Sequence, residues 1–253
     1  MPDPLFLILA AVEEPTFWTK TVAVAGVAGS SYALGSICFA ILFTKWFTGK
    51  DIRVLGSGNA GTSNVFRSAG FWPGALTGIF DFAKGVLAVY AGYWLFEWTG
   101  FDAYTGGCCA ALFVLVGHLY PIFFDYRGGK GVMTVAGILV VLNWRVFLVL
   151  ITVYTVILII SRITSVAGLG AATLMPITNA IFQIMDEKPW VPTTAYLTLI
   201  TILIWYTHRD NLKRLKEGRE NRATVYVEKD DMKQHIPSGR GTDDPSDRGA
   251  DAE

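Results

Sequence analysis

Residues 55–67 read LGSGNAGTSNVFR and separate two apolar segments, at about 21–47 and 72–98. The stretch is rich in glycine, hydroxyl and amide side chains, and it ends in Arg67. Each flanking segment exceeds the roughly 20 helical residues that cross a hydrocarbon core. The pattern predicts two membrane helices joined by a polar loop, over about 48–71, that binds phosphate at the membrane edge.

The composition of the whole chain supports a membrane protein. Of 253 residues, 52% are hydrophobic and 17% are charged, and the mean hydropathy is +0.42. Soluble domains usually have about a quarter charged residues. We expect one integral-membrane domain over 1–228 and a disordered polar tail over 229–253. Because the net charge is zero, no nucleic-acid partner is expected.

Further apolar segments predict more helices, and the fold class is therefore an all-α polytopic bundle. An unbroken helix over 132–160 would be about 44 Å long and would bury Arg145 near mid-bilayer, so we divide it. A short interfacial helix is expected within 1–19. About seven membrane helices are predicted, the others being at about 106–124, 131–142, 145–160, 165–185 and 193–208.

The basic residues predict the orientation of these helices. Lys and Arg gather in alternate loops and in the segment after residue 208, while the loop at 99–106 has none. Basic loops stay in the cytoplasm. The N-terminus is therefore predicted outside and the C-terminus inside, with Arg145 as the one mild exception. The glycine-rich loops then all face the cytoplasm.

The first glycine-rich loop matches the dinucleotide pattern G-x-G-x-x-G at Gly56, Gly58 and Gly61. That pattern needs a strand before it and a parallel strand after a crossover helix, whereas membrane helices are predicted here. Glycines nevertheless let backbone N–H groups converge on a phosphate, and Arg67 adds a planar fork. A flexible polar loop without a ligand is the alternative. The neutral donors beside the glycines are Ser57, Asn59, Thr62, Ser63 and Asn64.

A second loop has the sequence Gly128-Gly129-Lys130-Gly131, ten residues after His118. It is not a Walker A loop, because Gly131 stands where Ser or Thr would hold magnesium. It does offer a second cationic, glycine-flanked anion site at a helix start. His118 alone is more typical of a packed, hydrogen-bonded histidine than of a catalyst.

A third polar group follows the last apolar segment. His208, Asn211, Leu212 and Leu215 have the spacing of one helical face. A basic amphipathic helix on the membrane surface is one interpretation. The other turns His208 and Asn211 toward the glycine-rich loops, where Ser165 could add a hydroxyl.

The remaining polar residues favour no metal chemistry. Asp81 and Lys84 share a helical face and form either a structural ion pair or the wall of an active site. Cys38, Cys108 and Cys109 lie in apolar segments and are interpreted as packing residues. We find no metal-ligand set, no G-x-S-x-G elbow and no H-x4-D acyltransferase signature. Neither a metal nor another cofactor is expected.

At these motifs the chain resembles the bacterial membrane-bound acyl-phosphate:glycerol-3-phosphate acyltransferases of the PlsY type. The similarity covers about 30–222. It rests on three motifs. The first is GSGNAGTSN at 56–64 with Arg67, and the second is Gly117-His118 with Pro121 and GGKG at 128–131. The third is HRDN at 208–211 with Arg214-Leu215 and Gly218-Arg219-Glu220. Tyr32 to Ser36 and DFAKG at 81–85 also match. The chain departs from the family at Thr62-Ser63, usually Ala-Thr, and at Met133, usually a small residue.

The resemblance implies transfer of a fatty acyl group from acyl-phosphate to the 1-hydroxyl of glycerol 3-phosphate, the first step of phospholipid synthesis, in the bacterial inner membrane. It implies that Arg67 and Lys130 bind phosphate, and that Ser57, His208 and Asn211 act with them in catalysis. The general base is either His208 or the substrate's own phosphate, and the resemblance favours the phosphate. The implied binding residues are Gly56, Gly58, Asn59, Gly61, Ser63, Asn64, His118, Gly128, Gly129, Gly131 and Ser165.

Two other classes of function remain open from the sequence. Polar loops between membrane helices also form solute sites, so a transporter of a phosphorylated solute is one alternative. A lipid phosphatase is the other. The oligomeric state is open as well, with a monomer as the simplest expectation.

Overall fold

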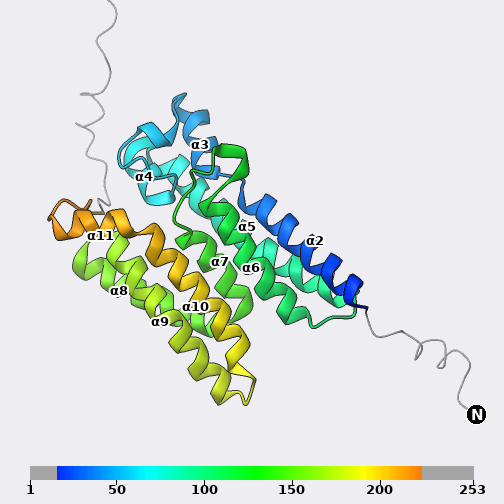
Figure 1. The fold of residues 1–253 in the computed structure, drawn as a ribbon. Helices are drawn as coiled ribbons and strands as arrows, with labels where there is room; N and C mark the ends of the chain where they lie inside the picture. The colour runs from blue at the N-terminus through cyan, green and yellow to red at the C-terminus, as the bar shows by residue number, and fades with distance from the viewer. Residues whose placement is uncertain (1–15, 224–253) are drawn as a thin grey trace, which may run out of the picture. The chain divides into compact units, whose positions relative to one another are not determined.

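Residues 16–223 are described by a computed structural model, and every regular element among them is helical (Figure 1). The expected tail at 229–253 and most of the expected interfacial helix within 1–19 lie outside these residues. Five helical segments are long and apolar enough to cross a membrane. Two further apolar helices, over 132–142 and 191–207, are shorter.

The first predicted helix, at about 21–47, is in fact two helices. α2 covers Phe17–Gly35 and α3 covers Phe39–Thr48, with a break at 36–38. At the break, the ammonium group of Lys84 on α5 (Phe71–Trp98) acts in place of helical N–H donors. It donates to the carbonyls of Gly35 and Ile37, at 3.1 and 3.0 Å. The prediction of one continuous helix was wrong because the break depends on this distant side chain.

The first glycine-rich segment is less loop-like than predicted. A 3₁₀ turn, η1, covers Ile52–Val54, and a helix, α4, covers Thr62–Ala69. Only the residues between them, with the short stretches at either end of the segment, are irregular. The expected loop over 48–71 is therefore corrected to a glycine turn that leads into a short helix.

α5 (Phe71–Trp98) and α6 (Ala103–Leu119) form the centre of the bundle. Ala110, Ala111, Val114 and Leu115 on α6 are completely buried. α6 ends before Pro121, and a 3₁₀ turn, η2, covers Ile122–Phe124, so the predicted helix end at 124 was too late. Proline lacks the N–H that a continuing helix needs.

The division of the long apolar stretch is confirmed. α7 covers Val132–Leu142 and α8 covers Trp144–Ser161. Asn143 lies between them in an extended conformation, and its side chain accepts a hydrogen bond from the Val146 N–H. Arg145 lies in the first turn of α8 and forms an ion pair with Asp186, so it does not lie in the middle of a long helix.

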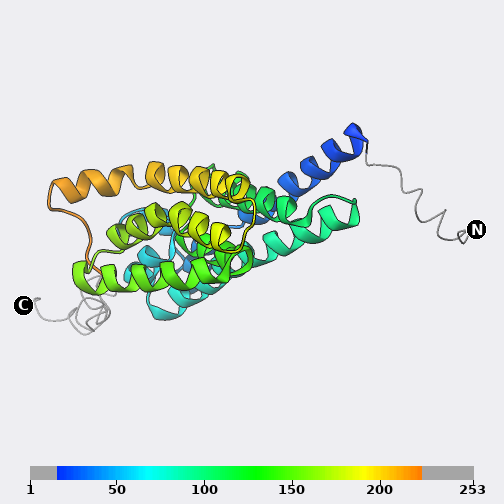
Figure 2. The same cartoon turned by 90° about the horizontal axis from the view of Figure 1, so that it is seen from below.

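The described part of the chain ends in three further helices: α9 (Thr164–Met185), α10 (Trp190–Thr207) and α11 (Arg209–Lys216). α10 begins before the predicted residue 193 because Pro192 is tolerated in a first helical turn. α9 packs against both α8 and α10, as Figure 2 also shows. In Figure 1, α4 and α11 lie toward the same end of the helices.

Candidate active site

Asn64 determines the shape of the first glycine-rich turn. Its Oδ1 accepts hydrogen bonds from the Ser57 backbone N–H and from the Arg67 guanidinium, each at 3.0 Å. Its Nδ2 donates to the carbonyls of Leu55 and Asn59, at 3.0 and 3.1 Å. Asn64 is 2% exposed. Its amide is therefore directed into the turn, where it orients Arg67.

The glycines of this turn are needed for its backbone. Gly56 has φ +53°, and a Cβ there would lie 2.5 Å from Asn64 Oδ1. Gly58 also lies in the left-handed region, with φ +70°. Gly61 caps α4 and brings no side chain to the first N–H groups of that helix. Ser57 and Ser63 are exposed at this surface, where they can donate hydrogen bonds to an anion.

Arg67 provides the cationic group of the first loop. Its guanidinium lies 3.4 Å from Ser57 Oγ as well as 3.0 Å from Asn64. Burial lowers the pKa of Arg67. The positive charge of Arg214 lowers this pKa further, whereas the negative charge of Glu220 raises it. An arginine remains charged at neutral pH despite such a shift. Arg67 thus presents an oriented, half-buried cation.

The second loop packs directly on the first. The N–H groups of Gly128 and Gly129 donate to the carbonyls of Leu119 and His118, both at 3.2 Å. A Cβ on Gly129 would collide with His118 Nε2 and would lie 2.6 Å from the Ala60 carbonyl oxygen. Only glycine fits between these two neighbours. Ala60 belongs to the first turn, so the structure brings the two predicted phosphate loops together.

Lys130 follows this close contact and donates to Asn211 Oδ1 on α11. Burial lowers the pKa of Lys130 to about 8, and the nearby Arg214 contributes in the same direction. Gly131 then adopts φ +82° as the N-cap of α7. The second loop therefore places a cation beside the third polar group.

His208 lies between α10 and α11 and is 2% exposed. Its Nδ1 is 2.8 Å from the Ile204 carbonyl oxygen. A carbonyl only accepts, so Nδ1 carries the proton and Nε2 is left as an acceptor in the neutral ring. Burial lowers the pKa of His208 to about 4, against the opposing effect of the Ile204 hydrogen bond. His208 is therefore neutral at pH 7.

Glu220 joins three parts of the chain and was not among the predicted site residues. It accepts hydrogen bonds from Ser165 Oγ on α9 at 2.9 Å, from Arg214 Nε at 2.9 Å, and from Asn211 Nδ2. Burial alone would raise the pKa of this carboxyl, but these hydrogen bonds outweigh burial and lower it. Its place in the third motif, next to Gly218 and Arg219, was the only signal for it in the sequence.

The site as a whole is electropositive. Arg214 forms an ion pair with Glu220. The charges of Glu220 and Arg214 also act on Arg67 and Lys130, where they shift the pKa values in opposite directions. Phosphate groups match such a cluster of cations and N–H donors. Arg214 was also missed as a site residue, because from the sequence it was one of several basic residues on a surface helix.

His118 lies beneath the second loop rather than within this cluster. It is 4% exposed, and its Nδ1 is 3.6 Å from Asp81 Oδ1. Its Nε2 faces Gly129. The structure therefore places His118 against the loop backbone. In residues 16–223, no three His, Cys, Asp or Glu side chains come together as a metal ion would require.

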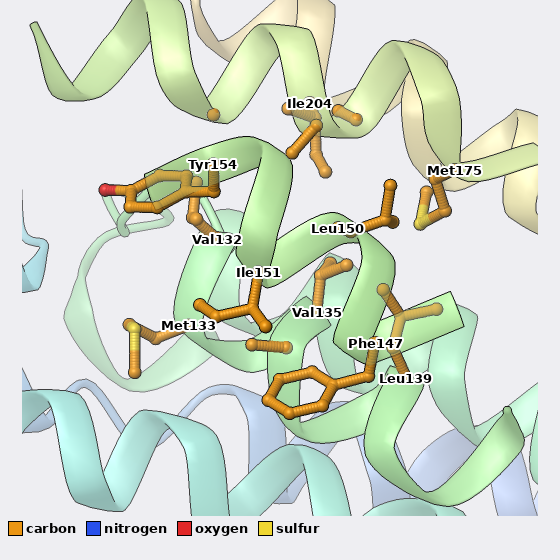
Figure 3. A pocket seen from close by; sticks show the side chains of 14 residues that line it. Val132, Met133, Val135, Leu139, Phe147, Leu150, Ile151, Tyr154, Met175 and Ile204 are labelled. Atoms are coloured by element: carbon orange, nitrogen blue, oxygen red, sulfur yellow. The ribbon is translucent and has the colours of Figure 1, made fainter. Parts of the chain in front are cut away.

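An apolar groove begins beside the polar cluster (Figure 3). Its empty volume is about 620 Å³ including its open side, and α7, α8, α9 and α10 line it. Three of its lining residues lie within about one helical turn of a polar site residue along the chain: Val132 of Lys130, Gly168 of Ser165, and Ile204 of His208. Figure 3 shows Val132 and Tyr154 toward one side and Leu139 and Met175 toward the other. The geometry suits a molecule with a phosphate at one end and a hydrocarbon chain at the other.

Comparison with known proteins gives one consistent family. The family model for glycerol-3-phosphate acyltransferase matches residues 25–218. A glycerol-3-phosphate acyltransferase of Carboxydothermus hydrogenoformans is 36% identical over 192 residues, which cover 76% of this chain and 92% of that protein. The Gluconobacter oxydans protein of the same name is 38% identical over 196 residues, covering 77% and 90%.

Solved structures agree with the sequence relatives. The crystal structure of PlsY, an integral membrane glycerol 3-phosphate acyltransferase, in its glycerol 3-phosphate form gives a TM-score of 0.68 at 32% identity. The alignment covers 79% of this chain and 94% of that one. Its lysophosphatidic acid form gives a TM-score of 0.66 at 31% identity, with the same coverage. The chain belongs to the glycerol-3-phosphate acyltransferase family.

Proposed function

We propose that the protein transfers the acyl group of an acyl-phosphate to the 1-hydroxyl of glycerol 3-phosphate. The products are 1-acylglycerol 3-phosphate and inorganic phosphate, in the first step of phospholipid synthesis. One observation carries the proposal: a group of cations that includes Lys130 and Arg214 lies at one end of an apolar groove whose lining includes Val132 and Gly168. The relatives' names and the two ligands named for PlsY support this choice of acceptor and product.

The two substrates share the cationic surface. Arg67 and Lys130 bind the phosphates, with Ser57, Ser63 and the N–H groups of the glycine turns as neutral donors. The acyl chain lies in the groove beyond Val132. Asn211 and Ser165 hold Lys130 and Glu220 in place through the hydrogen bonds described above. This arrangement brings the acceptor hydroxyl to the donor carbonyl and so lowers the entropic barrier.

The reaction needs no covalent enzyme intermediate, because acyl-phosphate is already an activated anhydride. The 1-hydroxyl oxygen forms a bond to the acyl carbon, and the bond from that carbon to the phosphate oxygen breaks. The cations stabilise the charge on the departing phosphate. The hydroxyl proton goes to a phosphate oxygen of a substrate, since a histidine with a pKa of about 4 is a weak base at neutral pH. His208 Nε2 then serves as a hydrogen-bond acceptor that orients the hydroxyl.

We further propose how the protein lies in the membrane. Seven helical spans, an outside N-terminus and a cytoplasmic C-terminus would put the cluster on the inner face of a bacterial cytoplasmic membrane. Support comes from the apolar helices and from the alternation of basic loops. We also propose that residues 1–228 act as one domain and as a monomer, with 229–253 as a separate tail.

The decisive experiment measures phosphate release from palmitoyl-phosphate by the purified protein. Release that requires glycerol 3-phosphate, with formation of lysophosphatidic acid, supports the proposal. Release without glycerol 3-phosphate would indicate a phosphatase, and uptake into vesicles without release would indicate a transporter. Acyl-CoA and acyl carrier protein thioesters are tested as alternative donors. Lys130→Met should lose the activity, while Ile160→Ala, at a lipid-facing position that is 79% exposed, should keep it.

A further inference from the structure

Three ionisable side chains outside the cationic cluster are buried together in the bundle. Asp81, Lys84 and His118 are 2%, 1% and 4% exposed. Lys84 Nζ lies 2.8 Å from Asp81 Oδ1, and His118 Nδ1 lies 3.6 Å from the same oxygen. Charged groups at such depth are costly and usually belong to a functional arrangement. The reaction proposed above uses none of them.

One end of this triad holds the break between α2 and α3. The Lys84 ammonium donates to the carbonyls of Gly35 and Ile37, which lie at the interruption of the helix. It also lies 5.6 Å from the centre of the Phe39 ring, at the start of α3. Lys84 thus fixes where α3 begins. α3 leads through η1 into the turn that positions Arg67.

The other end of the triad holds the second loop. The His118 carbonyl accepts from the Gly129 N–H at 3.2 Å. The His118 ring faces the same glycine, since a Cβ there would collide with Nε2. Gly129 directly precedes Lys130. Any shift of the His118 ring should therefore move the backbone at Gly129 and, with it, Lys130.

We infer that Asp81, Lys84 and His118 are positioning residues that set the two cation-bearing loops relative to each other. The inference rests on the roles proposed for Arg67 and Lys130. Asp81 joins the two ends of the triad: its carboxylate holds Lys84, which supports the first loop, and faces His118, which supports the second. A displacement of about 1 Å in a reacting geometry can cost about 100-fold in rate.

The test compares variants that disturb the triad with a matched buried control. One variant is His118→Asn. The other is the double change Asp81→Asn with Lys84→Met, which removes both members of the buried ion pair, so that no single buried charge remains without its partner. The control is Asn179→Leu, at a buried polar position on α9 that is about four helical turns from Ser165. Measurements are the melting temperature, the KM for glycerol 3-phosphate, kcat, and direct calorimetric binding of glycerol 3-phosphate.

The triad variants should raise the KM and the dissociation constant for glycerol 3-phosphate roughly 10-fold or more at temperatures where they remain folded. Asn179→Leu should change the melting temperature while the KM stays at the wild-type value. Gly129→Ala, whose Cβ would collide with the His118 ring and the Ala60 carbonyl, should share the kinetic signature of His118→Asn. The inference is overturned if folded triad variants keep the wild-type KM and dissociation constant. Failure of the wild type to bind glycerol 3-phosphate would instead contradict the proposed function.

Discussion

Lys130 donates a hydrogen bond to Asn211 Oδ1, although 81 residues separate them in the chain. Asn211 donates in turn to Glu220, which also accepts from Ser165. These bonds connect the second glycine-rich loop with α9, α11 and the segment after α11. The position of the Lys130 cation therefore depends on the C-terminal part of the chain.

Asn211→Leu should lower kcat/KM by about 10- to 100-fold, because Lys130 and Glu220 each lose their hydrogen bond to the Asn211 amide. Steady-state kinetics with both substrates check this. Leu215→Ala, on the same helix and 38% exposed, is the control and should behave as the wild type. Normal kinetics in the Asn211→Leu enzyme would show that Lys130 needs no help from α11.

The pH dependence of phosphate binding should follow Lys130. Burial lowers its pKa to about 8, so the charged form that attracts phosphate is lost as pH rises through 8. In the free enzyme, kcat/KM for glycerol 3-phosphate should therefore fall between about pH 7 and 9. Lys130→Arg keeps its charge throughout this range, and its profile should be flat there even if its activity is lower. The same downward limb in Lys130→Arg would assign the titration to another group.

Part of the fold could be predicted from single segments of sequence. The division at Asn143 followed from the cost of burying Arg145, which is a local argument. The break at 36–38 could not be foreseen, because Lys84 stabilises it from 47 residues away in the chain. Pattern analysis detects helices but not which distant side chain satisfies their ends.

The site shows the same limit. From the sequence, Arg67 and Lys130 were predicted to bind phosphate because each lies close to glycines whose backbone N–H groups can converge on an anion, and these roles stay a prediction. Glu220 looked like one more charge in a basic surface segment, but in the structure its carboxylate accepts hydrogen bonds from Ser165, Asn211 and Arg214. The groove was not predictable either. No single helix encodes a space that four helices leave between them.

Arg67→Lys should reduce kcat/KM by about 100-fold. The Arg67 guanidinium is oriented by Asn64 and lies beside Ser57, whereas a lysine ammonium cannot reproduce its planar fork. The kinetic assay is phosphate release at varied glycerol 3-phosphate. Arg209→Lys is the control, because Arg209 is exposed and stacks on Tyr206. Near-normal kinetics in Arg67→Lys would contradict the phosphate-binding role.

Glu220→Gln should lower the free energy of unfolding by about 3 kcal/mol, because it removes the charge that Arg214 pairs with in a site where the Glu220 side chain is 5% exposed. Thermal or denaturant unfolding in detergent measures this. Glu217→Gln is the control, since its ion pair with Arg219 lies at the surface and should contribute less than about 1 kcal/mol. Equal effects of the two changes would mean that Glu220 is no better buried than Glu217.

Ala136→Phe should make the enzyme select shorter acyl chains. Val132, Ala136 and Leu139 line the groove in that order along α7, over about 10 Å of helix. A phenyl ring at 136 would fill the groove beyond its first part while leaving the polar cluster untouched. Long-chain acyl-phosphates should then lose about 10-fold or more in kcat/KM relative to an eight-carbon donor, and the KM for glycerol 3-phosphate should stay unchanged. Ile160→Phe adds the same ring at an exposed apolar position outside the groove and should leave chain selectivity as in the wild type. If Ala136→Phe accepts all chain lengths as the wild type does, the acyl chain lies elsewhere, and the groove is only a packing gap between α7 and α9.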